Sequence, residues 1–175
     1  MAFGSPSLKG KALQWLAQRE HSRAELQAKL LRHAAKAHSK AAQTTAPAAP
    51  DLAPENDGPG EQADITRVLD ELAAAGLQSD SRAAASLART KCSRYGVHRL
   101  KQQLKAKGLD AELVAQTVGI ARETELERAR EIWRRRYGEP AQDLAQRARQ
   151  VRFLISRGFD SELVRRVVGG AADTD

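Results

Sequence analysis

The chain repeats a twelve-residue pattern, and this repeat limits the folds open to it more than any other feature. Residues 108–119 align with residues 158–169, and seven of the twelve positions are identical. Upstream of each copy stands the same tripeptide, Arg94-Tyr95-Gly96 in one and Arg136-Tyr137-Gly138 in the other. Repetition of this kind is typical of small supersecondary units that stack on their neighbours and share a core with them.

The apolar residues recur at helical spacing along nearly the whole chain, and no segment alternates as a strand would. Ser22 and Glu25 have the spacing of a capping box, and Asp110 and Asp160 are placed to cap two later helices. Three glycines are predicted to end helices in the left-handed conformation, namely Gly76, Gly108 and Gly158.

Two helices near the carboxyl end have well-defined predicted core faces. The first carries Leu126, Ala129, Trp133 and Tyr137 on one side. For the second, the spacing predicts a narrow buried stripe made of Leu144, Ala148, Val151 and Ile155.

We therefore expect an all-α protein built from three tandem three-helix repeats, each too small to bury a full core alone. The repeats are expected at residues 8–78, 79–121 and 122–170, with flexible ends at 1–7 and 171–175. Stacking of such units gives an elongated body. Of the 34 Leu, Ile, Val and Phe residues in the chain, only Leu52 lies between His33 and Asp64. A disordered Ala/Pro-rich and acidic insertion is thus predicted at about 39–62, inside the first repeat.

The charge balance points to an acidic partner. The chain has 29 Lys and Arg against 22 Asp and Glu, a formal charge of +7, which suits nucleic acid or an acidic protein surface. Cys92 is the single cysteine, so a disulfide framework is excluded and a cytoplasmic location is the default. No uncharged stretch is long enough to span a bilayer.

Catalytic chemistry is not indicated. The sequence has no phosphate loop, dinucleotide fingerprint or zinc-protease motif, and its four histidines lack the spacing of a helical metal site. Cys92 shares a helix face with Leu87 and Ala88, which favours a small buried hydrophobe over a nucleophile. We expect no enzyme activity, no catalytic residues, no metal and no cofactor.

One charged region stands out as a candidate binding surface. Residues 82–109 contain eight Lys and Arg and no Asp or Glu. His98, Lys101 and Lys105 share one flank of a helix, beside its buried stripe, and two arginines of a later helix are predicted to project from its polar side. A basic face that serves solubility alone is the alternative. The candidate partner-binding residues are Arg94, His98, Arg99, Lys101, Lys105, Lys107, Arg128 and Arg135.

Three ordered motifs resemble the bacterial regulatory protein family RecX. The opening motif begins Arg19-Glu20-His21-Ser22 and continues with Glu25, Leu26, Lys29 and Leu30. The central motif is Tyr95-Gly96, then Arg99-Leu100, Leu104 and Lys107-Gly108-Leu109. The closing motif is Phe153-Leu154 followed by Arg157-Gly158-Phe159. The insertion and the Ser81-Arg82-Ala83-Ala84 stretch, which lacks an aromatic residue often found there, depart from the family pattern.

The resemblance implies a curved molecule of three-helix repeats that modulates the RecA recombinase. Such proteins bind RecA, lodge in the groove of its filament on single-stranded DNA, and block strand exchange, ATP hydrolysis and coprotease activity. We expect a monomer with no membrane contact, acting in DNA repair, homologous recombination and the SOS response. A weak direct contact with nucleic acid stays open, as does the alternative of a sequence-nonspecific DNA- or RNA-binding helical module. A purely structural adaptor is a third alternative.

Overall fold

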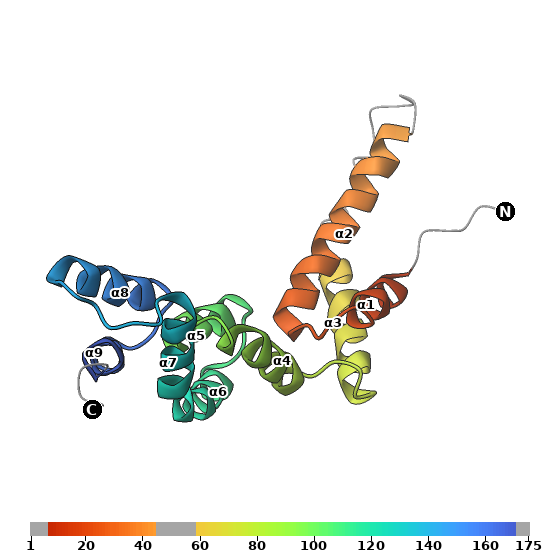
Figure 1. Ribbon diagram of the computed structural model, residues 1–175. Coiled ribbons are helices and arrows are strands. Elements are labelled where there is room, and N and C mark those ends of the chain that lie inside the picture. Colours follow the sequence, from red (N-terminus) through yellow and green to blue (C-terminus); the bar gives the residue numbers. More distant parts are fainter. Residues whose placement is uncertain (1–6, 45–58, 171–175) are drawn as a thin grey trace. The chain divides into compact units, whose positions relative to one another are not determined.

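The computed structural model describes residues 7–44 and 59–170, and every regular element in these two ranges is a helix (Figure 1). In chain order these are α1 (Leu8–Leu16), α2 (Arg23–Thr44), α3 (Pro59–Ala74), α4 (Asp80–Cys92), α5 (Val97–Ala106), α6 (Ala111–Glu123), α7 (Glu125–Arg136), α8 (Leu144–Ser156) and α9 (Ser161–Gly169). The expected all-α class is confirmed. Among the described residues, none of these helices combines the length and apolarity needed to cross a membrane.

Local signals explain where several helices begin and end. The Asp110 carboxylate accepts the amide of Leu113 at 2.9 Å, and the Ser22 hydroxyl accepts that of Glu25 at 3.1 Å. Asp160 accepts two amides of the first turn of α9, at 2.9 and 3.4 Å. The predicted left-handed ends have φ of +68°, +68° and +82°, at Gly76, Gly108 and Gly158. These caps satisfy amides and carbonyls that a helix cannot pair internally.

The chain forms two compact units, residues 1–83 and 84–175, and the boundary falls within α4. In the first unit α1, α2 and α3 pack against one another, and Figure 1 shows α1 and α3 along one end of α2. Their core consists of Ala12, Leu26, Leu30, Ile65, Val68, Leu69 and Leu72. Burial of these side chains supplies the main driving force for this unit.

The second unit contains two hydrophobic cores. One is formed by α4, α5, α6 and Leu109, and its buried members are Ala84, Val97, Leu100, Leu104, Leu109, Val114 and Ala121. The other is formed by α7, α8, α9 and Phe159, with Ala129, Ile132, Trp133, Leu154, Phe159, Val164, Val167 and Val168. Helices α6 and α7 are in contact. Each core thus belongs to three helices, as in an all-α helical repeat fold.

The predicted stripe of α8 is only partly confirmed, because Val151 packs against the core but two other members do not. Leu144 is 83% exposed and Ile155 is 41% exposed, whereas Gln150 and Leu154 face the core. Gln150 is buried because its amide oxygen accepts the indole N–H of Trp133 at 2.9 Å, and its amide nitrogen donates to the carbonyl of Glu139 at 3.3 Å. A search for apolar spacing misses a buried face whose central residue is polar and hydrogen-bonded.

Helix covers both ends of the predicted insertion. α2 continues to Thr44 and α3 begins at Pro59, so residues 39–44 and 59–62 are helical and not disordered. Alanine, lysine and glutamine dominate residues 40–43, and these are strong helix formers. The central part of the insertion, residues 45–58, and the predicted flexible ends at 1–6 and 171–175 lie outside the described residues.

In the first unit, a polar cluster holds the start of α4 against the start of α2. One carboxylate oxygen of Asp80 accepts the amide of Arg23 at 2.7 Å and the side-chain amide of Gln78 at 2.7 Å. Arg82 donates to the Glu20 carboxylate at 2.9 Å. We call Glu20, Arg23, Gln78, Asp80 and Arg82 the first joint. The side-chain amide of Gln78 also donates to the carbonyl of His21 at 3.4 Å, and the Arg82 guanidinium donates to that of Gly76 at 2.9 Å. The first joint thus depends mainly on side chains.

Candidate partner-binding surface

The candidate surface is built on α5, which has one buried face and one basic face. Val97, Leu100 and Leu104 are at most 2% exposed and point into the core. Lys101 follows Leu100 and Lys105 follows Leu104, and both lysines are exposed. In the described part of the chain neither lysine forms an ion pair or hydrogen bond. Two unpaired ammonium groups on a rigid helix can attract an anionic partner.

His98 and Arg99 lie at the start of α5 and are partly used within the second unit. His98 Nε2 is 3.5 Å from a carboxylate oxygen of Asp160. The two capping amides, more than this histidine, hold the pKa of Asp160 below its ordinary value. The Arg99 guanidinium lies 4.9 Å from the centre of the Tyr95 ring. Lys107, at the end of α5, is half-buried.

Arg128 is placed differently from the other candidates, because its guanidinium points into the protein. It donates to the carbonyl of Cys92 at 2.8 Å, to that of Tyr95 at 3.1 Å and to that of Ala121 at 2.6 Å. Its Nε also donates to the Thr124 hydroxyl at 3.2 Å. Four donors satisfied in this way link the end of α4, the end of α6 and the start of α7. Arg128 therefore does not project from the polar side of α7, and its role is to position these helix ends.

A buried carboxylate completes the same link. Glu125, which is 1% exposed, accepts the amide of Val97 at 2.9 Å. This amide begins α5, where Gly96 offers no side chain to cap it. A carboxylate from the first turn of the next repeat thus caps the second helix of the preceding one. Asp80 does the same for Arg23 in the first unit. This repeated device is not visible in the sequence, because donor and acceptor are 28 and 57 residues apart.

The turn between α8 and α9 docks by its backbone on the start of α5. The amide of Gly96 donates to the carbonyl of Arg157 at 3.0 Å, and that of His98 donates to the carbonyl of Gly158 at 3.1 Å. A Cβ on Gly96 would lie 2.2 Å from the Gly158 carbonyl oxygen, so only glycine allows this approach. We call these backbone contacts, with Glu125 and Arg128, the second joint.

Beside the second joint lies a hollow with a volume of about 410 Å³. We call it the arginine pocket and define it by Arg94, Tyr95, Arg135, Arg136, Phe153 and Arg157. Ser93 and Ile132 complete its lining, which contains no carboxylate. Arg94 and Arg135 were expected to bind a partner from the sequence. Arg136 and Arg157 were not, because they join Arg94 and Arg135 around one hollow only in the fold.

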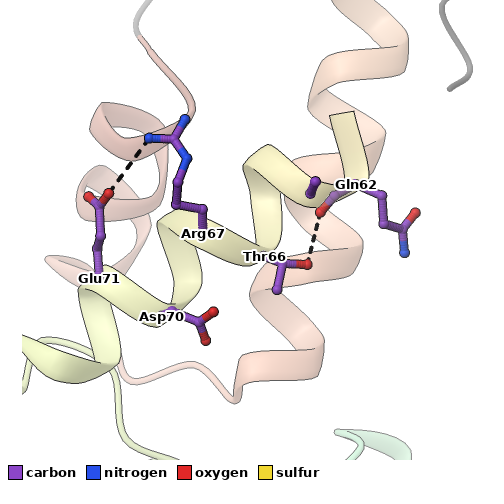
Figure 2. A pocket seen from close by; sticks show the side chains of 6 residues that line it. Gln62, Thr66, Arg67, Asp70 and Glu71 are labelled. Atoms are coloured by element: carbon purple, nitrogen blue, oxygen red, sulfur yellow. Dashed lines mark hydrogen bonds and ion pairs between the residues drawn. The ribbon is translucent and has the colours of Figure 1, made fainter. Parts of the chain in front are cut away.

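A second hollow, along α3, offers a contrast. It has a volume of about 590 Å³, and Figure 2 shows Arg67 and Glu71 extending from α3 toward one another, 3.8 Å apart. Lys9 holds the pKa of Glu71 below its ordinary value, and Asp70 lies 2.6 Å from Arg23. The Thr66 hydroxyl donates to the carbonyl of Gln62. The charged residues that line this hollow are paired with neighbouring charges, so the hollow has no preference for an anionic or a cationic ligand.

Cys92 is half-buried and packs against the core of α4, α5 and α6. Burial raises the pKa of its thiol, which leaves the thiol protonated and weakly nucleophilic near neutral pH. Within residues 7–44 and 59–170, no three His, Cys, Asp or Glu side chains are grouped to hold a metal ion.

Sequence comparisons match the chain to one family. Residues 79–118 match the second three-helix domain of RecX, and residues 123–168 match the third. A protein named "Regulatory protein RecX" from Leptothrix cholodnii is 44% identical over 170 residues, covering 96% of this chain and 92% of that protein. One of the same name from Ralstonia pickettii is 35% identical, covering 94% of this chain and 88% of that protein.

A structural comparison agrees with the fold. The crystal structure of RecX from Lactobacillus salivarius superposes with a TM-score of 0.68, covering 95% of this chain and 96% of that one, at 16% sequence identity. At this identity the match supports the fold alone. Together with the extended match to the regulatory proteins of Leptothrix and Ralstonia, the repeat pattern and the three motifs lead to one conclusion: the chain belongs to the RecX family of regulatory proteins.

Proposed function

We propose that this chain is a non-enzymatic inhibitor of the RecA recombinase, which binds RecA and lodges in the groove of its filament on DNA. In this role it acts in the cytoplasm and limits recombination and the SOS response. Membership of the RecX family supports the proposal. The observation that carries its residue-level part is the exposed, unpaired pair Lys101 and Lys105 on α5.

The proposed mechanism needs no catalytic group. A repeat protein can contact more than one protomer of a helical assembly, and such a bridge blocks the groove or opposes the conformational cycle of the filament. The lysine flank of α5 would face acidic surface of RecA or the DNA that it holds. Charges at the rim of an interface act mainly on association rate and on salt dependence.

Reversing both charges on α5 tests this mechanism. We expect Lys101→Glu with Lys105→Glu to raise the concentration needed for half-inhibition of RecA's DNA-dependent ATP hydrolysis by roughly tenfold at low salt. The effect should shrink as the Debye length falls below about 8 Å. The fold should survive, because exposed substitutions usually change the free energy of unfolding by no more than about 0.5 kcal/mol each. Circular dichroism checks this point.

A matched control separates position from net charge. Arg149 and Arg165 are exposed residues of α8 and α9, and Arg149→Glu with Arg165→Glu changes the net charge by the same amount. This control should inhibit RecA nearly as well as the parent chain. Equal inhibition by a folded Lys101/Lys105 variant at low salt would remove the α5 flank from the mechanism.

A further inference from the structure

The arginine pocket concentrates positive charge that the protein itself does not neutralise. Four guanidinium groups line one hollow of the second unit, and none of its lining residues is acidic. Glu131 lies 3.6 Å from Arg135, but both side chains are largely exposed and so screened by solvent. Arg94 and Arg136 have no ion-pair partner within the described residues. Like charges gathered in a concave surface raise the local concentration of anions.

Two of the pocket's side chains are already held in place. The Arg157 guanidinium lies 4.6 Å from the centre of the Phe153 ring and donates to the carbonyl of Arg94 at 3.1 Å. The Phe153 ring in turn meets Tyr137 edge-on, with 5.5 Å between ring centres. A guanidinium fixed over a ring keeps its remaining N–H donors available in a defined plane, which suits an oxyanion with several oxygens.

The pocket also has an apolar wall, formed by Tyr95, Phe153 and the buried Ile132. An acidic peptide presents carboxylates and little flat apolar surface. A nucleic-acid strand presents phosphodiesters next to bases, and proteins that bind single strands combine basic grooves with aromatic and guanidinium faces. Four arginines beside two rings therefore fit a strand better than they fit an acidic protein segment.

We propose that the arginine pocket binds the phosphodiester backbone of a single nucleic-acid strand directly, with Arg94, Arg135, Arg136 and Arg157 as the phosphate contacts. This inference goes beyond the proposed function, because the contact needs no RecA. The site lies beside the second joint, so a strand bound there contacts both repeats of the second unit. The lysine flank of α5 remains a separate surface with its own test.

The test measures binding of a fluorescently labelled single-stranded oligodeoxythymidylate by anisotropy, with the full chain and without RecA. The variant is Arg94→Gln with Arg136→Gln, since both side chains are exposed and unpaired within the described residues. Each lost phosphate contact on a single strand gives up about 0.7 of a released counterion. We therefore expect at least about tenfold weaker binding at about 0.1 M salt, and a log–log salt slope smaller by about 1.4.

The control is Arg149→Gln with Arg165→Gln, which removes the same charge from exposed positions outside the pocket. It should lose much less affinity than the pocket variant. Equal losses in the two variants would mean that only net charge matters, and this would overturn the proposed site. Unchanged binding by a pocket variant that remains folded by circular dichroism would overturn it as well.

A competition arm decides between the two kinds of partner. Unlabelled oligodeoxythymidylate should displace the labelled strand, whereas polyglutamate of matched charge should not. Displacement by polyglutamate in the parent chain and not in the pocket variant would overturn the proposal in favour of an acidic protein segment. Inhibition of RecA is measured on the same variants. A pocket variant that loses DNA binding and still inhibits RecA supports this site and leaves the proposed function intact.

Discussion

The two joints use the same carboxylate device, one in each unit, but in different surroundings. In the first joint Asp80 caps the amide of Arg23, and side chains supply the surrounding contacts. In the second joint Glu125 caps the amide of Val97 and is almost fully buried. Two backbone hydrogen bonds from the α8–α9 turn add to it. A joint made of backbone contacts tolerates less change than one made of side chains, because a side chain can move aside.

The residue before the capped helix shows this difference most clearly. Ser22 precedes α2 and uses its hydroxyl to accept the amide of Glu25. Gly96 precedes α5 at the corresponding position, and the α8–α9 turn occupies the space where a side chain would be. The first repeat thus caps its helix by a local side chain, whereas the second gives up that cap and gains a backbone contact with the third.

The largest expected effect comes from Gly96→Ala. The new Cβ would lie 2.2 Å from a backbone oxygen that cannot move alone, so the joint must open and lose two hydrogen bonds. We expect a loss of about 3 kcal/mol in the free energy of unfolding of the second unit. The chain has two tryptophans, one in each unit, so Trp133 fluorescence in a Trp15→Phe background reports this unit during urea unfolding.

Two control variants, one at a glycine and one at a serine, are compared with Gly96→Ala. Gly119 lies inside α6 with no atom within 4 Å of an added Cβ, so Gly119→Ala should stabilise the second unit by up to about 1 kcal/mol. Ser22→Gly at the equivalent position of the first joint should lower the free energy of unfolding of the first unit by only about 0.3 kcal/mol, because glycine is a tolerated cap. If Gly96→Ala costs as little as Ser22→Gly, the second joint is not held by its backbone.

The two capping carboxylates give the next largest contrast. Glu125→Ala leaves a buried amide without an acceptor and should cost about 2–3 kcal/mol, since hydrogen bonds to charged groups are the stronger ones. Asp80→Ala should cost about 1 kcal/mol, because water can reach the partly exposed first joint. Trp133 reports the first variant and Trp15, in a Trp133→Phe background, reports the second. Equal costs would show that burial does not distinguish the joints.

Features set by nearby residues were predicted correctly from the sequence. The caps at Asp110 and Asp160 and the left-handed ends at Gly108 and Gly158 depend on contacts within one turn. The tripeptide Arg-Tyr-Gly marked two important glycines, but for different reasons. Gly138 has a positive φ of +76°, whereas Gly96 has a φ of −78° that any residue adopts, and is required by the backbone that packs on it.

Features set by distant residues were missed or misassigned. The buried face of α8 depends on the hydrogen bond between Gln150 and Trp133, which no apolar pattern contains. Arg128 has a polar position on its own helix, yet its partners are carbonyls at the ends of other helices. The arginine pocket likewise combines the end of α4 with α7 and α8. Sequence spacing describes one element at a time, and these sites are made by several.

The smallest expected effect concerns pH and should appear in the first unit alone. His21 precedes α2 beside the first joint and is 1% exposed, and its carbonyl accepts the side-chain amide of Gln78 at 3.4 Å. Burial is the main cause that lowers the pKa of His21, and the charge of Arg19 lowers it further. Glu25, 3.3 Å away, acts in the opposite direction. With a folded pKa below the ordinary value of 6.5, the unfolded chain binds more protons in the interval between the two values.

Stability of the first unit should therefore fall as the pH decreases from about 7.5 to about 5.5, by at most about 1.4 kcal/mol per pH unit. His21→Gln should remove most of this dependence, as Trp15 fluorescence during urea unfolding would show. His98 is the single histidine of the second unit, and its side chain is exposed. The pKa of Asp160 is lowered from its ordinary value of 3.8, so its carboxylate affects stability only at more acidic pH. Its stability should stay nearly constant over the same interval. An equal loss in both units would mean that His21 is not the cause, and a pH-independent first unit would mean that its imidazole is not held neutral by burial.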